Sequence, residues 1–297
     1  MFDEHREHDS LVMESTLTPA VLRLASGSIE RVTGSADDGL EERAPKVTFD
    51  WEGGVGEFAC DRVTDLGERR RAENMFLGAF RYLNAQLFRE RVVPSASNPY
   101  ILRIREAQLG KIGDPDSMLS ASSPGALGVI RLAANWYEVD LRRAAGVILH
   151  ESVHQLLYGR EYGESPVRFG SIGYSPWKRR ERPGRLVWHA FWTFAVQLGF
   201  LVDTVGNMRG CKMDGSSQIV EMLAHLESCH CSLRIFEIVQ AEEELARIEA
   251  ALHRISQVIS AMPLGEGGAD RIRLAREHAR SEFNGWAARL LGQSRMV

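Results

Sequence analysis

The stretch AAGVILHESVHQLLYGREYG, from Ala144 to Gly163, contains a His-Glu-x-x-His motif made by His150, Glu151 and His154. Histidines four residues apart lie on one face of a helix, so they can bind one metal ion together. Neutral imidazole binds zinc, iron, copper and nickel alike, and the pair does not select among them. Because this helix is apolar, two buried histidines would cost stability unless an ion pairs with them. The alternative is two hydrogen-bonded core histidines with Glu151 between them by coincidence.

Two familiar sources of a third ligand fit this sequence poorly. The extended metzincin motif requires Gly at position 157 and His at position 160, where the chain has Leu157 and Arg160. A thermolysin-like site takes a Glu from a later helix. Glu221 and Glu227 are available for this role, but neither begins the Glu-x-x-x-Asp pattern of those sites. The stronger candidate is a histidine.

His189 is this candidate because of the segment in which it lies. It stands near the start of a long apolar stretch, and His189, Thr193 and Gln197 follow one another at intervals of four. Such spacing makes a polar seam on an otherwise buried helix, and the seam should face a polar cavity. The alternative is a core histidine satisfied by hydrogen bonds, with solvated arginines nearby.

Three protein ligands would leave open positions on the ion, which is the requirement for catalysis. With zinc, Glu151 would act as general base to a bound water, and the reaction would be peptide or amide hydrolysis. With ferrous iron, the open positions would take a 2-oxo acid and dioxygen. A dicarboxylate cosubstrate needs a cation for its far carboxylate, and a guanidinium forms the best bidentate pair. Arg182 and Arg185, just before His189, therefore favour oxidation over hydrolysis.

Three segments, HESVHQLLY, YSPWKRRERP and RLVWHAF, together resemble the HExxH-motif peptide-modification proteins found beside bacterial ribosomal-peptide pathways. That group includes 2-oxoglutarate-dependent HExxH-type peptide β-hydroxylases. The similarity covers about Met118 to Phe200, a little over a quarter of the chain. No motif of this kind is found in residues 1–60 or 206–297.

The resemblance implies iron held by His150, His154 and His189, with 2-oxoglutarate as the cosubstrate. It also implies that Arg182, at the Arg-Pro step, contacts 2-oxoglutarate. In an oxygenase Glu151 need not be a base and could orient a ligand or the substrate. The implied reaction is hydroxylation at the β-carbon of a residue in a ribosomally made peptide, or of a related amino acid. Presentation by a leader peptide or a carrier protein is left open.

The fold expected to position these residues is α+β and predominantly helical, with a small β-sheet beside the HExxH helix. Strands are predicted at 46–51, 100–107 and 125–133, and helices at 66–93 and from Leu141 onward. A long loop is expected between the His-bearing helices, from 161 to 184, where Tyr174 and Trp177 could pack over the substrate. The segment 117–130 could supply an edge strand that pairs with an extended peptide.

Three regions are predicted along the chain: an N-terminal polar and partly helical segment (1–45), a metal-binding catalytic core (46–205) and a C-terminal helical region packed on the core (206–297). A helix near 17–32 is possible within the first region. In a third hypothesis the protein is a non-catalytic binding module, and its C-terminal helices hold a partner or a carrier domain.

Composition narrows the choice of partners and location. The formal net charge of -4 gives no reason to expect a nucleic-acid surface, and the basic run at 178–182 is short. The four cysteines lack framework spacing and the N-terminus is acidic, which favours a reducing cytoplasm. The segment 186–202 is slightly short for a membrane span and contains three polar residues, so it should be a buried core helix. The expected partner is therefore a peptide or amino-acid substrate, and no membrane partner is expected. The sequence does not indicate an oligomeric state.

Overall fold

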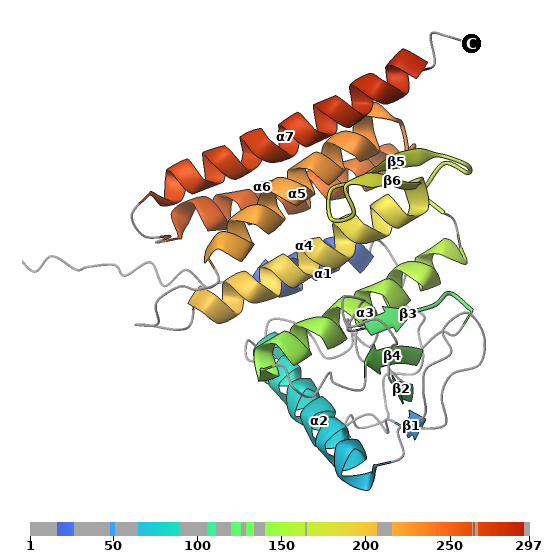
Figure 1. Ribbon diagram of the computed structural model, residues 1–297, viewed down its shortest axis with the longest axis vertical. Helices are drawn as coiled ribbons and strands as arrows, with labels where there is room; N and C mark the ends of the chain where they lie inside the picture. Colours follow the sequence, from blue (N-terminus) through green and yellow to red (C-terminus); the bar gives the residue numbers. More distant parts are fainter. Residues whose placement is uncertain are drawn as a thin grey trace, which may run out of the picture.

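The structure, a computed structural model, places seven helices and six strands in the residues that it describes (Figure 1). These residues are 17–26, 48–50, 65–88, 106–110, 120–125, 129–133, 140–163, 165–206, 216–262, 264 and 267–293. The helices are α1 (Leu17–Ser26), α2 (Leu66–Phe88), α3 (Leu141–Glu161), α4 (Gly184–Gly206), α5 (Ser216–Ile235), α6 (Glu242–Ala261) and α7 (Gly268–Gln293). The strands are β1 (Thr48–Asp50), β2 (Glu106–Gly110), β3 (Ser120–Ser122), β4 (Val129–Ala133), β5 (Ile172–Ser175) and β6 (Arg180–Pro183). The mostly helical α+β fold predicted from the sequence is confirmed.

The larger sheet lies beside the helix that carries the His-Glu-x-x-His motif. Its strand order is β1-β2-β4-β3, with the first three strands parallel and β3 antiparallel at the edge. Helix α3 packs against β3 and α2 on one side and against α4 on the other (Figure 1). The motif is therefore held between the sheet and α4.

Helices α3 and α4 run antiparallel along each other. The start of α3 is fixed by Asp140, whose carboxylate accepts hydrogen bonds from the backbone N–H groups of Arg142 (2.9 Å) and Arg143 (3.1 Å). Residues late in α3 then meet residues early in α4, and Gly146, early in α3, lies against Phe200 near the other end. This pairing brings one face of each helix together over most of its length.

A buried carboxylate joins three of the helices. Glu244 of α6 is fully buried and accepts hydrogen bonds from the indole N–H groups of Trp188 (2.7 Å) and Trp192 (2.8 Å) on α4. It also pairs with Arg160 of α3 at 2.6 Å and with Arg247 at 2.8 Å. Burial alone would raise the pKa of this carboxyl, but the hydrogen bonds and charge of Arg160, with the two indoles, hold it below its usual range. Glu244 is therefore ionised and fixes α3 against α4.

Helix α4 is the most apolar element of the core. It is the one helix among the described residues that is long and apolar enough to cross a membrane by length and composition. Most of it is buried, however, and Trp188, Phe191 and Trp192 are fully enclosed. The sequence-based interpretation as a buried core helix is confirmed, while a cytoplasmic location stays a prediction.

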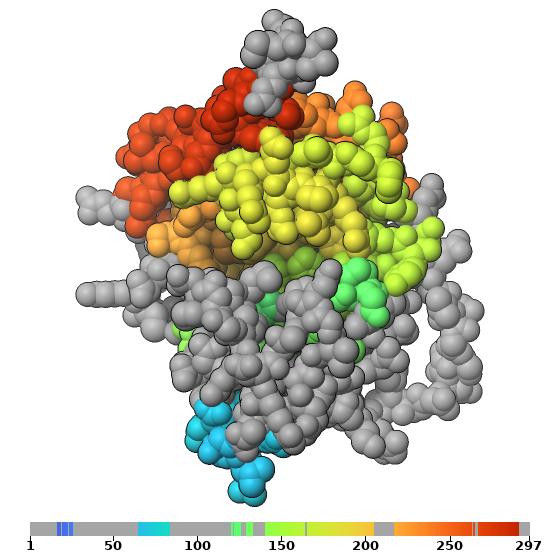
Figure 2. Space-filling view, turned by 45° about the vertical axis from the view of Figure 1, so that its right-hand side comes forward, coloured from blue at the N-terminus to red at the C-terminus, as the bar shows by residue number. Residues whose placement is uncertain are grey.

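The expected long loop at 161–184 is wrong in part, because it contains the hairpin β5–β6. The two strands pair antiparallel, and Arg179 takes a left-handed conformation (φ 49°) in the turn between them. Neither short strand shows an alternating pattern, so its sequence does not reveal it. The hairpin is stabilised by packing: Gly173 has no side chain where β5 touches Ile238, and Ser232 of α5 accepts from the Tyr174 N–H at 2.8 Å. Figure 2 shows this yellow-green region on the surface, with α7 in red above it.

Other sequence predictions agree with the fold to different extents. The predicted strands at 46–51 and 125–133 contain β1 and β4. The predicted strand at 100–107 overlaps β2 only at its last two residues, because β2 continues to residue 110. Residues 100–105 and 27–32 lie outside the described part, as do residues 45 and 46. The predicted boundary between 205 and 206 falls at the last residue of α4, and the division into three regions stays a prediction.

Substitution of Glu244, the buried hydrogen-bond acceptor, tests its structural role. We expect Glu244→Ala to lower the free energy of unfolding by roughly 3–5 kcal/mol, because it leaves the guanidinium of Arg160 buried without its partner. Glu244→Gln keeps an acceptor for the indole N–H groups and should fall between this variant and the original protein. Urea denaturation followed by circular dichroism measures both. The matched control, Glu249→Ala, removes an exposed ion pair and should change stability by less than about 1 kcal/mol. Equal stability of all four proteins would contradict this role of Glu244.

Candidate functional site

The three histidines predicted to bind a metal meet between α3 and α4. The ring centroids of His150 and His154 are 4.9 Å apart, and those of His154 and His189 are 5.3 Å apart. The Nδ1 atoms of His154 and His189 approach to 3.0 Å. Two ring nitrogens at this distance cannot both carry a proton, so either one donates to the other or both lone pairs face one cation. The antiparallel pairing of the helices thus brings the three predicted ligands together.

The outward nitrogens of two of these rings have oxygen neighbours. Nδ1 of His150 lies 3.2 Å from Oε1 of Gln197, and Nε2 of His189 lies 3.3 Å from Oε2 of Glu161. The second contact is within ion-pair distance but lacks the direction of a hydrogen bond, so both of its atoms are buried without one. Histidines that bind metals commonly have an amide or carboxylate oxygen against the other ring nitrogen, which fixes the tautomer. Gln197 and Glu161 are placed for that role.

All three imidazoles favour the neutral form. Burial lowers the pKa of His150 and of His189, and it outweighs the nearby carboxylates, which raise the pKa. The pKa of His154 lies well below its usual value, because of burial first and then because of the adjacent histidines and arginines. Neutral imidazole is the form that binds a metal ion, so the protonation state of the cluster suits a ligand set.

Glu151 lies at the sheet side of the cluster. Its carboxylate is buried, and Oε1 accepts a hydrogen bond from the Ser120 hydroxyl of β3 at 2.6 Å. Its second oxygen, Oε2, is buried and has no hydrogen-bond partner in the described part of the chain. A buried polar atom without a partner is rare and is a sign of a missing ion, water or substrate group.

The donor types and protonation states therefore suit a metal ion, whereas the side-chain arrangement is not that of a loaded site. Within the ranges that the structure describes, no three His, Cys, Asp or Glu side chains form a ready metal-binding group. The rings of His154 and His189 contact each other instead. An ion would have to replace that contact, which requires the two rings to turn.

The two predicted anion-binding arginines differ in what they contact. Nε of Arg185 pairs with Oε1 of Glu161 at 2.6 Å, and its Cζ lies 5.4 Å from the ring centroid of Tyr158. Arg182 is half-buried, and among the described residues its guanidinium has no hydrogen bond or ion pair. The positive charge of Arg182 contributes to the low pKa of His154, so the Arg182 side chain lies near the histidine cluster. Arg182 is thus the arginine available to an anionic ligand.

Of the other residues predicted to belong to the site, one lies beside the histidine cluster and two have their contacts elsewhere. The hydroxyl of Thr193 donates to the backbone oxygen of His189 at 3.0 Å, so it is satisfied within its own helix. Trp177 stacks on Phe194 with centroids 4.0 Å apart, and Phe194 contacts the ring of His150 at 5.0 Å. Trp177 therefore lies beside the cluster. Its predicted companion, Tyr174, instead joins Phe283 and Trp286 in a small aromatic cluster under α7.

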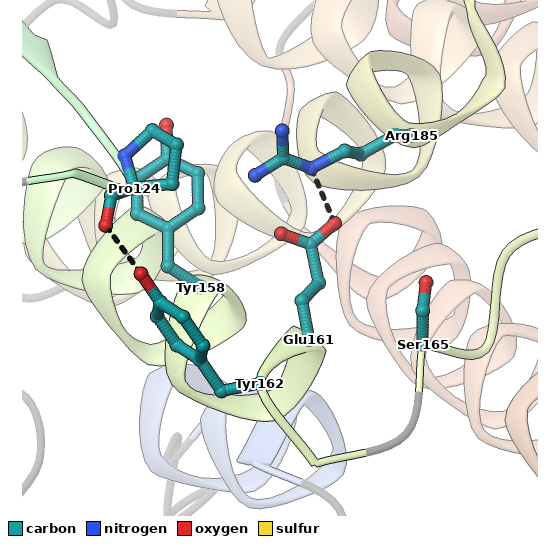
Figure 3. Close-up of a pocket in the computed structure, with 6 residues that line it drawn as sticks. All are labelled: Pro124, Tyr158, Glu161, Tyr162, Ser165 and Arg185. Atoms are coloured by element: carbon teal, nitrogen blue, oxygen red, sulfur yellow. Dashed lines mark hydrogen bonds and ion pairs between the residues drawn. The ribbon is translucent and has the colours of Figure 1, made fainter.

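A pocket of about 270 Å³ opens next to His189 (Figure 3). Its lining residues come from the end of α3 and the segment that follows it, from the start of α4 and from the segment after β3, and they are Pro124, Tyr158, Glu161, Tyr162, Ser165 and Arg185. The ring of Tyr158 lies 4.8 Å from the ring of His189, centroid to centroid. The pocket and the histidine cluster therefore share a wall.

Sequence reasoning missed several residues of the site. Tyr158 and Glu161 follow His154 at intervals of four and seven, so helical spacing alone places them on the same face of α3. That signal could have found both. Nothing in the sequence connects Ser120 with Glu151, because their contact depends on how β3 lies against α3.

The carboxylate behind His189 gives a direct test of the cluster. We expect Glu161→Gln to weaken metal binding about 10- to 100-fold, because an uncharged amide orients the imidazole less strongly. Cobalt(II) titration in competition with a chelator measures the affinity. Glu237→Gln is the matched control, since its side chain is largely exposed and, among the described residues, pairs with Arg168 alone. Unchanged affinity in Glu161→Gln would show that this carboxylate does not support a ligand.

The buried neutral histidines also predict a pH dependence of stability in metal-free protein. Their pKa values are lowered in the folded state, whereas in the unfolded chain they are about 6.5. The unfolded state therefore takes up protons first, and the free energy of unfolding should fall as the pH drops below about 6.5. Urea denaturation of chelator-treated protein between about pH 7.5 and 5.5 measures this slope. His154→Gln should have a shallower slope than the original protein, and an identical slope would contradict the prediction.

Comparison with known proteins adds no family to this geometry. A scan against protein-family models and a search of the curated proteins both return no match to the chain. The side chains between α3 and α4 therefore carry the functional argument.

Proposed function

We propose that the protein is an Fe(II)- and 2-oxoglutarate-dependent hydroxylase. Its substrate would be a residue in a peptide, or a related amino acid, hydroxylated at the β-carbon. The observation that carries this proposal is the half-buried Arg182, which no carboxylate among the described residues neutralises, beside three neutral histidines. A dicarboxylate cosubstrate needs such a cation, whereas hydrolysis of a peptide does not.

The three imidazoles would hold the iron, one from each of His150, His154 and His189. When bound, iron would supply the reaction of dioxygen with 2-oxoglutarate, in which one oxygen atom enters succinate, CO2 is released and the other oxygen atom converts the substrate C–H group to C–OH. Glu161 contacts the outward ring nitrogen of His189, and Gln197 contacts that of His150. These contacts would fix the orientation of the two rings. Arg182 binds the far carboxylate of the cosubstrate.

The surroundings of the cluster exclude water and orient the substrate. Phe194 and Trp177 cover the side of His150, and Tyr158 covers the side of His189. Since such a reaction depends on positioning one C–H bond in a dry site, these aromatic walls are as necessary as the ligands. Glu151, held by Ser120, has one oxygen left to accept a hydrogen bond from the substrate.

A peptide substrate is supported by the position of β3. This strand lies at the edge of the larger sheet and pairs with β4 on one side. Ser120 in β3 contacts Glu151, so an extended peptide added beside the strand would run next to the motif. Main-chain hydrogen bonds would then give affinity without fixing the peptide sequence.

A zinc-dependent metallopeptidase is the second candidate. The unpartnered oxygen of Glu151 next to two neutral histidines is also what a general base for a bound water requires. In that reaction Arg182 would have no necessary part. The two candidates therefore differ in how they respond to loss of this arginine.

Anaerobic reconstitution with iron(II), followed by measurement of succinate formed from 2-oxoglutarate, tests the proposal. We expect Arg182→Ala to raise the KM for 2-oxoglutarate about 10- to 100-fold through loss of a charged hydrogen bond. Lys178→Ala, on the same hairpin, should leave this KM unchanged. No succinate above a His154→Ala control, over a broad panel of peptides and amino acids, would contradict the hydroxylase. Zinc-loaded protein that cleaves peptides equally well after Arg182→Ala would favour the peptidase.

A further inference from the structure

The pocket next to His189 has two unlike sides (Figure 3). Pro124 and the rings of Tyr158 and Tyr162 form one side, and the paired Glu161 and Arg185 form the other. Its volume, about 270 Å³, is enough for one large side chain. The ring of Tyr158 lies between this space and the ring of His189, so a substrate bound at the histidines would have a neighbouring residue close to the pocket.

On the aromatic side the ring of Tyr162 is exposed, whereas Tyr158 is buried with the His189 ring and the Arg185 guanidinium against it. The hydroxyl groups of both tyrosines are already used. The Tyr158 hydroxyl donates to the backbone oxygen of Ser122 at 3.3 Å, and the Tyr162 hydroxyl donates to that of Pro124 at 2.9 Å. Both bonds tie the end of α3 to the segment after β3. The two tyrosines are four residues apart at the end of α3, so their rings lie on one face of the helix end.

The charged side is neutral as a whole. Nε of Arg185 pairs with Oε1 of Glu161 at 2.6 Å, and the other carboxylate oxygen is buried against His189. The guanidinium of Arg185 also lies over the ring of Tyr158. An acidic or basic side chain entering the pocket would lose its hydration without gaining an unpaired partner of opposite charge. An uncharged, flat side chain avoids that cost and can stack on the tyrosine rings.

We propose that this pocket receives an aromatic side chain of a residue flanking the one that is modified. Tyr158 and Tyr162 are then specificity-determining residues, and Pro124 completes their side of the pocket. The inference rests on the proposed function, because it takes the histidine cluster as the reaction centre. It adds that the substrate is a peptide with an aromatic residue next to the hydroxylated position.

Binding of short blocked peptides to the full-length protein tests this directly. The probes are N-acetyl-Ala-Xaa-Ala-amides in which Xaa is Phe, Leu, Ala, Lys or Glu, and calorimetry or ligand-observed NMR measures their Kd. We expect the Phe peptide to bind about tenfold more tightly than the Ala peptide. The Lys and Glu peptides should bind no better than the Ala peptide. Equal Kd values for the Phe and Ala peptides, or no binding of either, would overturn the proposal.

Variants at exposed positions test whether the preference for Phe arises in this pocket or elsewhere on the molecule. Tyr162→Ala removes one ring and Ser165→Trp fills the space, and both side chains are exposed, so the fold should tolerate the changes. Both should reduce the preference for Phe to near onefold, while Tyr162→Phe retains it because the ring is kept. Leu274→Trp, at an exposed position of α7, is the matched control and should bind like the original protein. A full preference for Phe in Tyr162→Ala would overturn the assignment.

The proposed function is read out separately, by cobalt(II) binding and by succinate formation. Metal binding and succinate formation without a preference for Phe would overturn the pocket and leave the hydroxylase standing. A preference for Phe that Tyr162→Ala abolishes, in protein that neither binds metal nor forms succinate, would support the pocket as a peptide site and overturn the hydroxylase.

Discussion

The carboxylate of Glu244 is the interaction on which the rest of the site depends. It lies fully buried on α6 and holds Arg160 of α3 together with two tryptophans of α4. Arg160 lies on the same helix as His154, and Trp188 directly precedes His189. Since a buried charge tolerates little displacement of its partners, this one carboxylate sets how far apart the two His-bearing helices lie. Helix α6, which carries Glu244, thus contributes to the shape of the site although none of the predicted metal ligands lies on it.

Between these helices, polar side chains form a sequence of facing pairs. Glu161 meets His189 and Arg185 at one end, and His150 meets Gln197 further along. The pairs allow several polar groups to be buried in an apolar interface, because each group faces another across the seam. Among the described residues, the second oxygen of Glu151 has no hydrogen-bond partner, and no carboxylate pairs with the guanidinium of Arg182. These two groups, together with the histidines, are the basis of the proposed function.

Local periodicity explains which parts could be predicted from the sequence. The spacing of His150 and His154, and of His189, Thr193 and Gln197, follows from the helical repeat, so the seam could be predicted before its partner was known. The hairpin β5–β6 could not, because its strands are short and are held by α5 rather than by their own pattern. The same reason separates Trp177 from Tyr174: Tyr174 lies in β5 and is buried under α7, whereas Trp177 lies in the turn that follows the strand. Contacts between distant segments, such as Ser120 with Glu151, leave no local signal.

The register of the hairpin has a consequence for what sequence changes it can accept. Glu181 pairs with Tyr174 and accepts from the Trp286 indole under α7, whereas Arg182 pairs with Gly173 and lies on the opposite face. Neighbouring residues of a strand alternate between faces, so a slip of one residue would exchange them. An insertion of one residue in the tight turn would then place the Glu181 carboxylate where the Arg182 guanidinium stands and reverse the electrostatic sign beside His154, whereas a deletion would place Pro183 there and remove the charge. Natural length variation in this turn should therefore come in pairs of residues or be absent.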